Sequence, residues 1–154
     1  MASPFFNQSS PIGSNPWTAY TPTGSWVTNV TYTGFWRRVG DSAEIVTKVL
    51  CSGAPTNASL NMTLPSGFTI DTAKLTTTSA GFADILGEAV CVDSGVNLYP
   101  GFVVYNSTTT VLGYVFKTDG TYAFAANFSS TVPFTFGSAD YVQFKFTVPI
   151  VGWS

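Results

Sequence analysis

The sequence predicts an all-β, antiparallel β-sandwich, and three observations carry that prediction. Residues 141–150 alternate between apolar and polar side chains, which is the period of a strand with one buried face. Turn signals at Gly40-Asp41 and at residues 117–120 each join two apolar runs, as in β-hairpins. No long stretch has the 3.6-residue period of a helix, and about eight to ten short strands at roughly 8–12-residue spacing favour a sandwich or barrel.

Residues 1–24 differ from the rest and are predicted to form an extended N-terminal arm. Four prolines in this segment break helices and prevent regular strand pairing. The arm also carries large apolar side chains that a free linker would lack, namely Phe5, Phe6, Ile12, Trp17 and Tyr20. Two interpretations stay open: the arm lies on the surface of another protein, or it folds back on its own domain.

Residues 25–154 are predicted to form one sandwich domain, since a chain of this length can bury a core of its own. The turn residues Pro65-Ser66-Gly67 and the loop at 131–140 separate some of its strands. In chain order, the expected strands cover residues 26–32, 35–39, 43–50, 58–64, 82–92, 101–105, 110–116, 121–126 and 141–150.

The last predicted strand needs a strand on each side. Its apolar side consists of Val142, Phe144, Phe146, Val148 and Ile150. Burying five such side chains stabilises the strand by about 10 kcal/mol, while ordering ten backbone residues costs about 10–20 kcal/mol. We therefore expect this strand inside a sheet, with its pairing lost near Pro149, which has no N–H donor. Ile150 and Trp153 would then need another cover, such as a neighbouring subunit.

Composition and charge exclude several classes of function. Charged residues make up only 9% of the chain and the net charge is −2, so there is no basic stripe for nucleic acid. No apolar run is long enough to span a membrane, and the N-terminal residues lack the pattern of a signal peptide, which predicts synthesis in a cytoplasm. With so few charged residues the surface must be largely neutral, which favours an oligomer or a subunit of a larger particle.

The residue types also argue against an enzyme. The chain has no histidine, which removes Ser-His and Cys-His nucleophiles and nearly every catalytic zinc site. Asp84 and Glu88 would lie about 13 Å apart on a strand, too far for a glycosidase pair. We predict no catalytic residues, no metal site and no cofactor.

Two sets of residues have competing interpretations. Cys51 and Cys91 are either two buried thiols or one disulfide bond. The tryptophans are either core and interface residues or a platform for stacking on sugars, namely Trp17, Trp26, Trp36 and Trp153.

The order of several motifs resembles the jelly-roll domains of tailed-bacteriophage virion proteins. The hairpin "YTGFWRRVGDSAEIVTKVL" comes first, "LPSGFTI" follows, and "TVPFTFGSADYVQFKFTVPIVGW" comes last. In that group an "LPxGF" element precedes "PFxF…D", an alternating strand and a final "P-I-x-G-W". The resemblance covers about residues 26–153, and "VPIVGW" is its most specific part.

The resemblance implies a homotrimer, similar to the trimeric jelly rolls of the tumour-necrosis-factor and complement-globular-head type. Aromatic and aliphatic residues of each subunit would pack around a threefold axis. The trimer interface would draw on Phe144, Phe146, Ile150 and Trp153, with the sandwich core as the alternative place for Phe144 and Phe146.

The resemblance also implies a place in the virion. We expect a head-decoration, or cement, protein on the outer capsid surface, made in the host cytoplasm, whose arm residues contact the major capsid protein. The short chain and its proline-rich arm favour a cement protein over a fibre domain. The alternative is a tail-fibre tip or lectin-like domain that binds a host glycan.

Overall fold

The computed structural model describes residues 15–79 and 84–153, and their architecture is all-β, with no α-helix in these two ranges. The strands are β1 (Thr18–Tyr20), β2 (Val30–Val39), β3 (Ser42–Cys51), β4 (Asn61–Thr63), β5 (Ile85–Asp93), β6 (Asn97–Ser107), β7 (Thr110–Thr118), β8 (Ala123–Asn127) and β9 (Tyr141–Pro149). A single 3-10 turn at Thr72–Lys74 interrupts the described strands. The predicted all-β class is confirmed.

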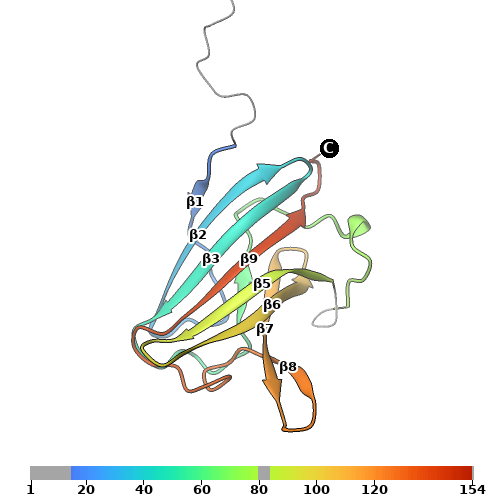
Figure 1. The fold of residues 1–154 in the computed structure, drawn as a ribbon. Helices are drawn as coiled ribbons and strands as arrows, with labels where there is room; N and C mark the ends of the chain where they lie inside the picture. The colour runs from blue at the N-terminus through green and yellow to red at the C-terminus, as the bar shows by residue number, and fades with distance from the viewer. Residues whose placement is uncertain (1–14, 80–83, 154) are drawn as a thin grey trace, which may run out of the picture.

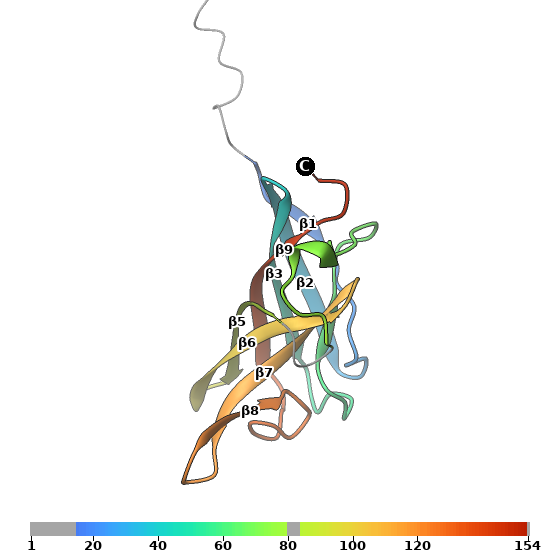
Figure 2. The ribbon, with the colours of Figure 1, turned by 90° about the vertical axis from the view of Figure 1, so that its right-hand side faces the viewer.

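The strands form one antiparallel sheet in the order β1-β2-β3-β9-β5-β6-β7-β4, with β8 added to β7 (Figure 1). The sheet twists strongly, so β2 and β7 run in clearly different directions (Figure 2). Its two ends approach each other where Gly24, after β1, bridges Met62 in β4. The inner face is thereby enclosed, an arrangement consistent with a β-sandwich.

The C-terminal strand β9 lies inside the sheet, as the energetic argument predicts. It pairs with β3 on one side and β5 on the other. Its apolar side is buried in the core, with exposed fractions of 2% or less for Val142, Phe144, Phe146, Val148 and Ile150. The strand ends at Pro149, where loss of pairing is expected.

Burial of this face corrects the predicted trimer interface. Phe144 and Phe146 take the alternative place expected for them, the core of one subunit, and Ile150 lies there too, so these three residues offer no surface to a partner. The cover of the C-terminal residues also comes from the same chain. The Trp153 ring lies 5.0 Å from the Phe68 ring and 6.0 Å from the Trp36 ring, so it needs no second subunit for that cover.

Residues 26–29 do not form the predicted strand, because Trp26 turns into the core. Its ring meets Phe136 edge-on at 4.9 Å, and its indole N–H donates to the Ala58 carbonyl. The backbone N–H groups of Val27 and Thr28 donate to the Thr56 hydroxyl instead of to a neighbouring strand. The alternating pattern there reflects packing of one tryptophan, and β2 begins only at Val30.

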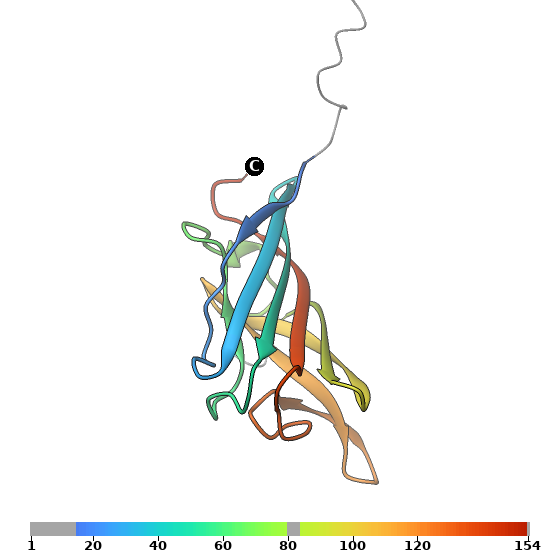
Figure 3. The same ribbon diagram turned by 90° about the vertical axis from the view of Figure 1, so that its left-hand side faces the viewer.

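Part of the predicted arm belongs to the sheet. β1 pairs with β2 over Thr18–Tyr20, and Asn15 donates its side-chain N–H to the Arg38 carbonyl. Residues 15–24 therefore fold back on their own domain, as one of the two interpretations of the arm expects. Figure 3 shows β1 along the edge of β2. The arm residues Phe5, Phe6 and Ile12 lie outside the described residues.

Candidate functional site

The outward face of the sheet, opposite the core, is the candidate functional site. Cross-strand pairing places one row of residues directly across this face: Phe35, Val46, Lys145, Glu88, Phe102 and Tyr114. Residues directly opposite each other on neighbouring strands point to the same side. The row is apolar at both ends and charged in the middle, so this face carries two separate apolar patches.

The first patch, here called the Phe35 groove, is a shallow hollow lined by Trp17, Phe35 and Val46. Trp17 is 41% exposed and Phe35 is 49% exposed, which is high for such large apolar side chains. Two further hollows adjoin Phe35, one toward Ala19 and one toward Lys48. Phe35 therefore stands at the centre of a continuous uneven surface.

Arg37 fixes one wall of the Phe35 groove. Its guanidinium lies 4.6 Å from the centre of the Trp17 ring and donates to the Glu44 carboxylate at 2.6 Å. Stacking on one ring face while the planar fork binds a carboxylate is a geometry that arginine supplies and lysine does not. The groove wall is thus held by a contact between the residue before β1 and the β2–β3 hairpin.

The second patch, here called the aromatic ridge, consists of Phe102, Tyr114 and Phe116 on β6 and β7. The Phe102 and Tyr114 rings are stacked at 5.4 Å with an interplanar angle of 9°, and Phe116 lies 5.3 Å from Phe102. Phe116 is 53% exposed. The β7–β8 hairpin extends beyond the rest of the sheet (Figures 1 and 2), so the ridge continues onto a projecting element.

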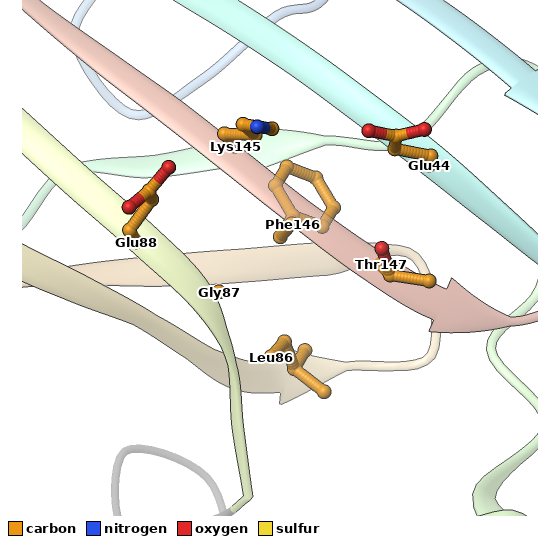
Figure 4. Close-up of a pocket in the computed structure, with 7 residues that line it drawn as sticks. All are labelled: Glu44, Leu86, Gly87, Glu88, Lys145, Phe146 and Thr147. Atoms are coloured by element: carbon orange, nitrogen blue, oxygen red, sulfur yellow. The ribbon is translucent and has the colours of Figure 1, made fainter.

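A polar band separates the two patches. Glu44, Glu88, Lys145 and Thr147 line an open hollow of about 290 Å³ in the middle of this face (Figure 4). Lys48, Lys145 and Glu88 take part in none of the ion pairs found among residues 15–79 and 84–153. The Lys48 ammonium lies over the Tyr141 ring at 4.6 Å. The band therefore holds both signs of charge, with Glu88 directly across from Lys145 and no short ion pair between these two side chains.

The close approach of β5 to β9 at this hollow depends on glycine. A Cβ atom on Gly87 would lie 2.1 Å from the Lys145 carbonyl oxygen and 2.5 Å from the Phe146 Cα. Both of those atoms belong to the backbone, which cannot move aside cheaply. The pairing of β5 also shifts register between Ile85 and Gly87, as at a β-bulge.

The remaining acids and thiols have structural surroundings. The Asp84 carboxylate accepts from the Thr76 amide and hydroxyl, and these bonds lower the pKa of Asp84. Cys51 and Cys91 are buried free thiols, which favours the first interpretation of the cysteines. Burial raises the pKa of Cys51 to about 11 and that of Cys91 further.

Within residues 15–79 and 84–153 there is no cluster of three or more His, Cys, Asp or Glu side chains arranged to hold a metal ion. In the same part of the chain, no helix has the length and apolarity that crossing a membrane requires.

The structure brings few of the predicted site residues together. Trp17 lines the Phe35 groove, but Tyr20 points inward, and its hydroxyl donates to the Thr63 carbonyl. Burial raises the pKa of Tyr20 accordingly. The tryptophans do not form a shared platform, because Trp26 is in the core while Trp36 and Trp153 pack around Phe68.

Sequence reasoning missed Phe35, Val46, Phe102 and Phe116 as surface residues. The alternation of β2 does not identify them, because Phe35 and Arg37 share one side of the strand while Trp36 and Arg38 share the other. Each side therefore has an aromatic residue and an arginine, and only the pairing of distant strands decides which side faces outward.

Comparison with known proteins adds no assignment to this geometry: no family model matches the chain, and searches of curated proteins and of solved structures likewise gave no match.

Proposed function

We propose that this protein is a structural subunit of a bacteriophage head. It is a homotrimeric jelly roll that decorates the outer capsid surface, bridges adjacent major capsid proteins and so stabilises the head. Its action is adhesive rather than catalytic, and it needs no cofactor. It is made in the host cytoplasm and then joins the virion.

One observation carries the proposal: a single sheet face bears two apolar patches, the Phe35 groove and the aromatic ridge, on a domain with few charges. Large exposed apolar patches are typical of protein–protein contact sites. Phe35 and Phe116 are about half exposed, although neither is needed to fill the core. A domain with two such patches is suited to contacts with more than one neighbour.

The resemblance in the "LPSGFTI" and "VPIVGW" motifs supplies the virion context. The central position of β9 fits a jelly roll whose terminal strand lies at the heart of each subunit. In a trimer, three arms carrying Phe5, Phe6 and Ile12 would engage capsid proteins together. Each bound arm raises the effective concentration of the next, with gains of about 10²–10⁴ in avidity.

The test combines native mass with capsid binding. The full chain and a variant lacking residues 2–14, which keeps β1, are compared by native mass spectrometry and by co-sedimentation with undecorated heads of the encoding phage. We expect trimers from both proteins and head binding from the full chain only. Monomers at micromolar concentration, or equal head binding by both proteins, would contradict the proposal.

A second candidate function rests on the exposed rings of Trp17 and Tyr122, which are 41% and 74% exposed. Exposed aromatic rings stack on the apolar faces of sugars, as in a fibre tip or lectin-like domain. Saturable binding to host surface polysaccharide, together with no binding to heads, would favour this alternative.

A further inference from the structure

The outward face contains the two parts of a contact between identical subunits. A closed ring of three subunits requires a heterologous interface, in which two different patches of each subunit meet. The Phe35 groove and the aromatic ridge are two such patches. This inference rests on the trimer of the proposed function and names the surfaces that build it.

The two patches complement each other in shape and polarity. The groove is a shallow hollow lined by Trp17, Phe35 and Val46. The ridge presents Phe116, 53% exposed, on a strand that continues into a projecting hairpin. A protruding phenyl ring and an apolar hollow each lose exposure to water when they meet, and burying one such ring fully contributes about 1.5–3 kcal/mol.

The charges beside the patches are of opposite sign. Lys48 borders the hollow next to Phe35, while Glu88, which lies between Lys145 and Phe102 in the cross-strand row, is the charge on the ridge side. Neither takes part in the ion pairs of the described ranges 15–79 and 84–153. Arg37, the other cation at the groove, is already bound to Glu44. Contact between groove and ridge would therefore bring Lys48 and Glu88 together.

The groove cannot be filled by the ridge of the same subunit. Phe35 in β2 and Phe102 in β6 are separated by β3, β9 and β5, which is roughly 19 Å at normal strand spacing. A twofold contact of groove on groove would set a hollow against a hollow and leave the ridge of each subunit exposed. A second copy offering its ridge avoids both problems.

We infer that the ridge of one subunit packs into the Phe35 groove of the next, with Phe116 between Trp17 and Phe35 and with Glu88 facing Lys48. Repeating the contact around the ring uses each groove and each ridge once. The strong twist of the sheet between β2 and β7 turns its two ends in different directions, as a closed ring requires (Figure 2).

The first test uses charge reversal at half-exposed or exposed positions that are not in the core. Lys48→Glu and Glu88→Lys are each expected to raise the concentration at which the trimer dissociates by about tenfold or more, because each places like charges in contact. The double variant, Lys48→Glu with Glu88→Lys, is expected to restore assembly. Lys74→Glu, at the end of the 3-10 turn, breaks ion pairs with Asp41 and Asp71 that lie within one subunit, so as the control it should leave the trimer unchanged.

The second test shows directly which residues meet. Phe35→Cys protein and Phe116→Cys protein are mixed, allowed to exchange subunits and treated with a short bis-maleimide. Cross-linked dimers are expected from the mixture and not from either variant alone, while wild type shows that buried Cys51 and Cys91 do not react.

The outcomes separate this inference from the function on which it rests. A wild-type monomer would overturn both the trimer and the contact. A wild-type trimer that is insensitive to charge reversal would overturn the contact alone. Cross-links within the Phe35→Cys sample alone would also overturn it, since they indicate a twofold contact.

Discussion

The guanidinium of Arg37 lies over the Trp17 ring, 4.6 Å from the centre of the indole, while the same group holds the Glu44 carboxylate. This contact ties the segment before β1 to the β2–β3 hairpin. It also holds the Trp17 ring in place at the Phe35 groove, so a surface residue shapes the candidate binding face.

Replacing Arg37 with methionine should loosen Trp17 without unfolding the domain. The variant loses a cation–π contact worth about 0.5–1 kcal/mol and a surface ion pair worth about 0.2–1 kcal/mol. We therefore expect the free energy of unfolding to fall by at most about 2 kcal/mol. Urea denaturation measures this loss, and the part of the acrylamide quenching that disappears in Trp17→Phe protein reports the exposure of Trp17 among the four tryptophans. Unchanged quenching would contradict the role assigned to Arg37. Arg38→Met, which removes a cation over Trp153 instead, is the matched control.

Replacing Gly87 with alanine should destabilise the whole sheet. The added methyl group would lie 2.1 Å from the Lys145 carbonyl oxygen, which forces β5 away from β9. We expect a loss of roughly 2–4 kcal/mol, in the range of overpacked or strained positions. Denaturant unfolding measures it, with Gly137→Ala as the control, since the nearest atom there lies 3.8 Å away. Equal stability of the Gly87→Ala and Gly137→Ala variants would contradict the close approach of β5 to β9.

The two cysteines should be unreactive in the folded protein. Both are buried, and burial raises the pKa of Cys51 to about 11. Because the folded-state pKa lies above the unfolded value of about 8.5, the neutral thiols favour the fold below that pH. This stability is lost as the pH rises toward the folded pKa. A thiol reagent at pH 8 should detect no thiols before denaturation and two afterwards, whereas two fast-reacting thiols in the native protein would refute the buried placement.

The stability of the turn at the end of the β7–β8 hairpin should decrease at acid pH. The Asp119 carboxylate accepts the amide N–H groups of Tyr122 and Thr121, and these bonds lower the pKa of Asp119. A lowered pKa means that the stabilisation is present above about pH 4 and is lost as the pH falls through the folded pKa. Amide chemical shifts of Thr121 and Tyr122 should follow that titration. They should stay nearly constant in Asp119→Asn, and a titrating shift in that variant would point to another group.

The strands and the burial of β9 were predictable because strict alternation, turn residues and a proline stop are local signals. Phe144 and Phe146 were correctly expected on one face of a central strand, but the sequence does not show what that face contacts. Their full burial in one subunit depends on segments such as the loop after β8, whose Phe128 ring lies 6.3 Å from the Phe144 ring only in the folded chain. That is why core residues were assigned to a trimer interface.

The candidate site was less predictable for a related physical reason. Phe35 and Phe116 lie in strands far apart in sequence, and only the strand order places both on one face. Alternation along a strand assigns each residue to one of two faces. Whether that face is covered or exposed depends on long-range strand pairing. The Trp153 ring illustrates the converse, since Phe68 and Arg38 cover it from distant segments.

The native mass of the full chain at micromolar concentration is the most direct measurement of self-association through the outward face. We predict three times the subunit mass of 16.4 kDa for the wild type, and a shift toward 16.4 kDa for Phe35→Ser at the same concentration. A wild-type mass of one subunit would contradict the trimer and, with it, the proposed role of both patches.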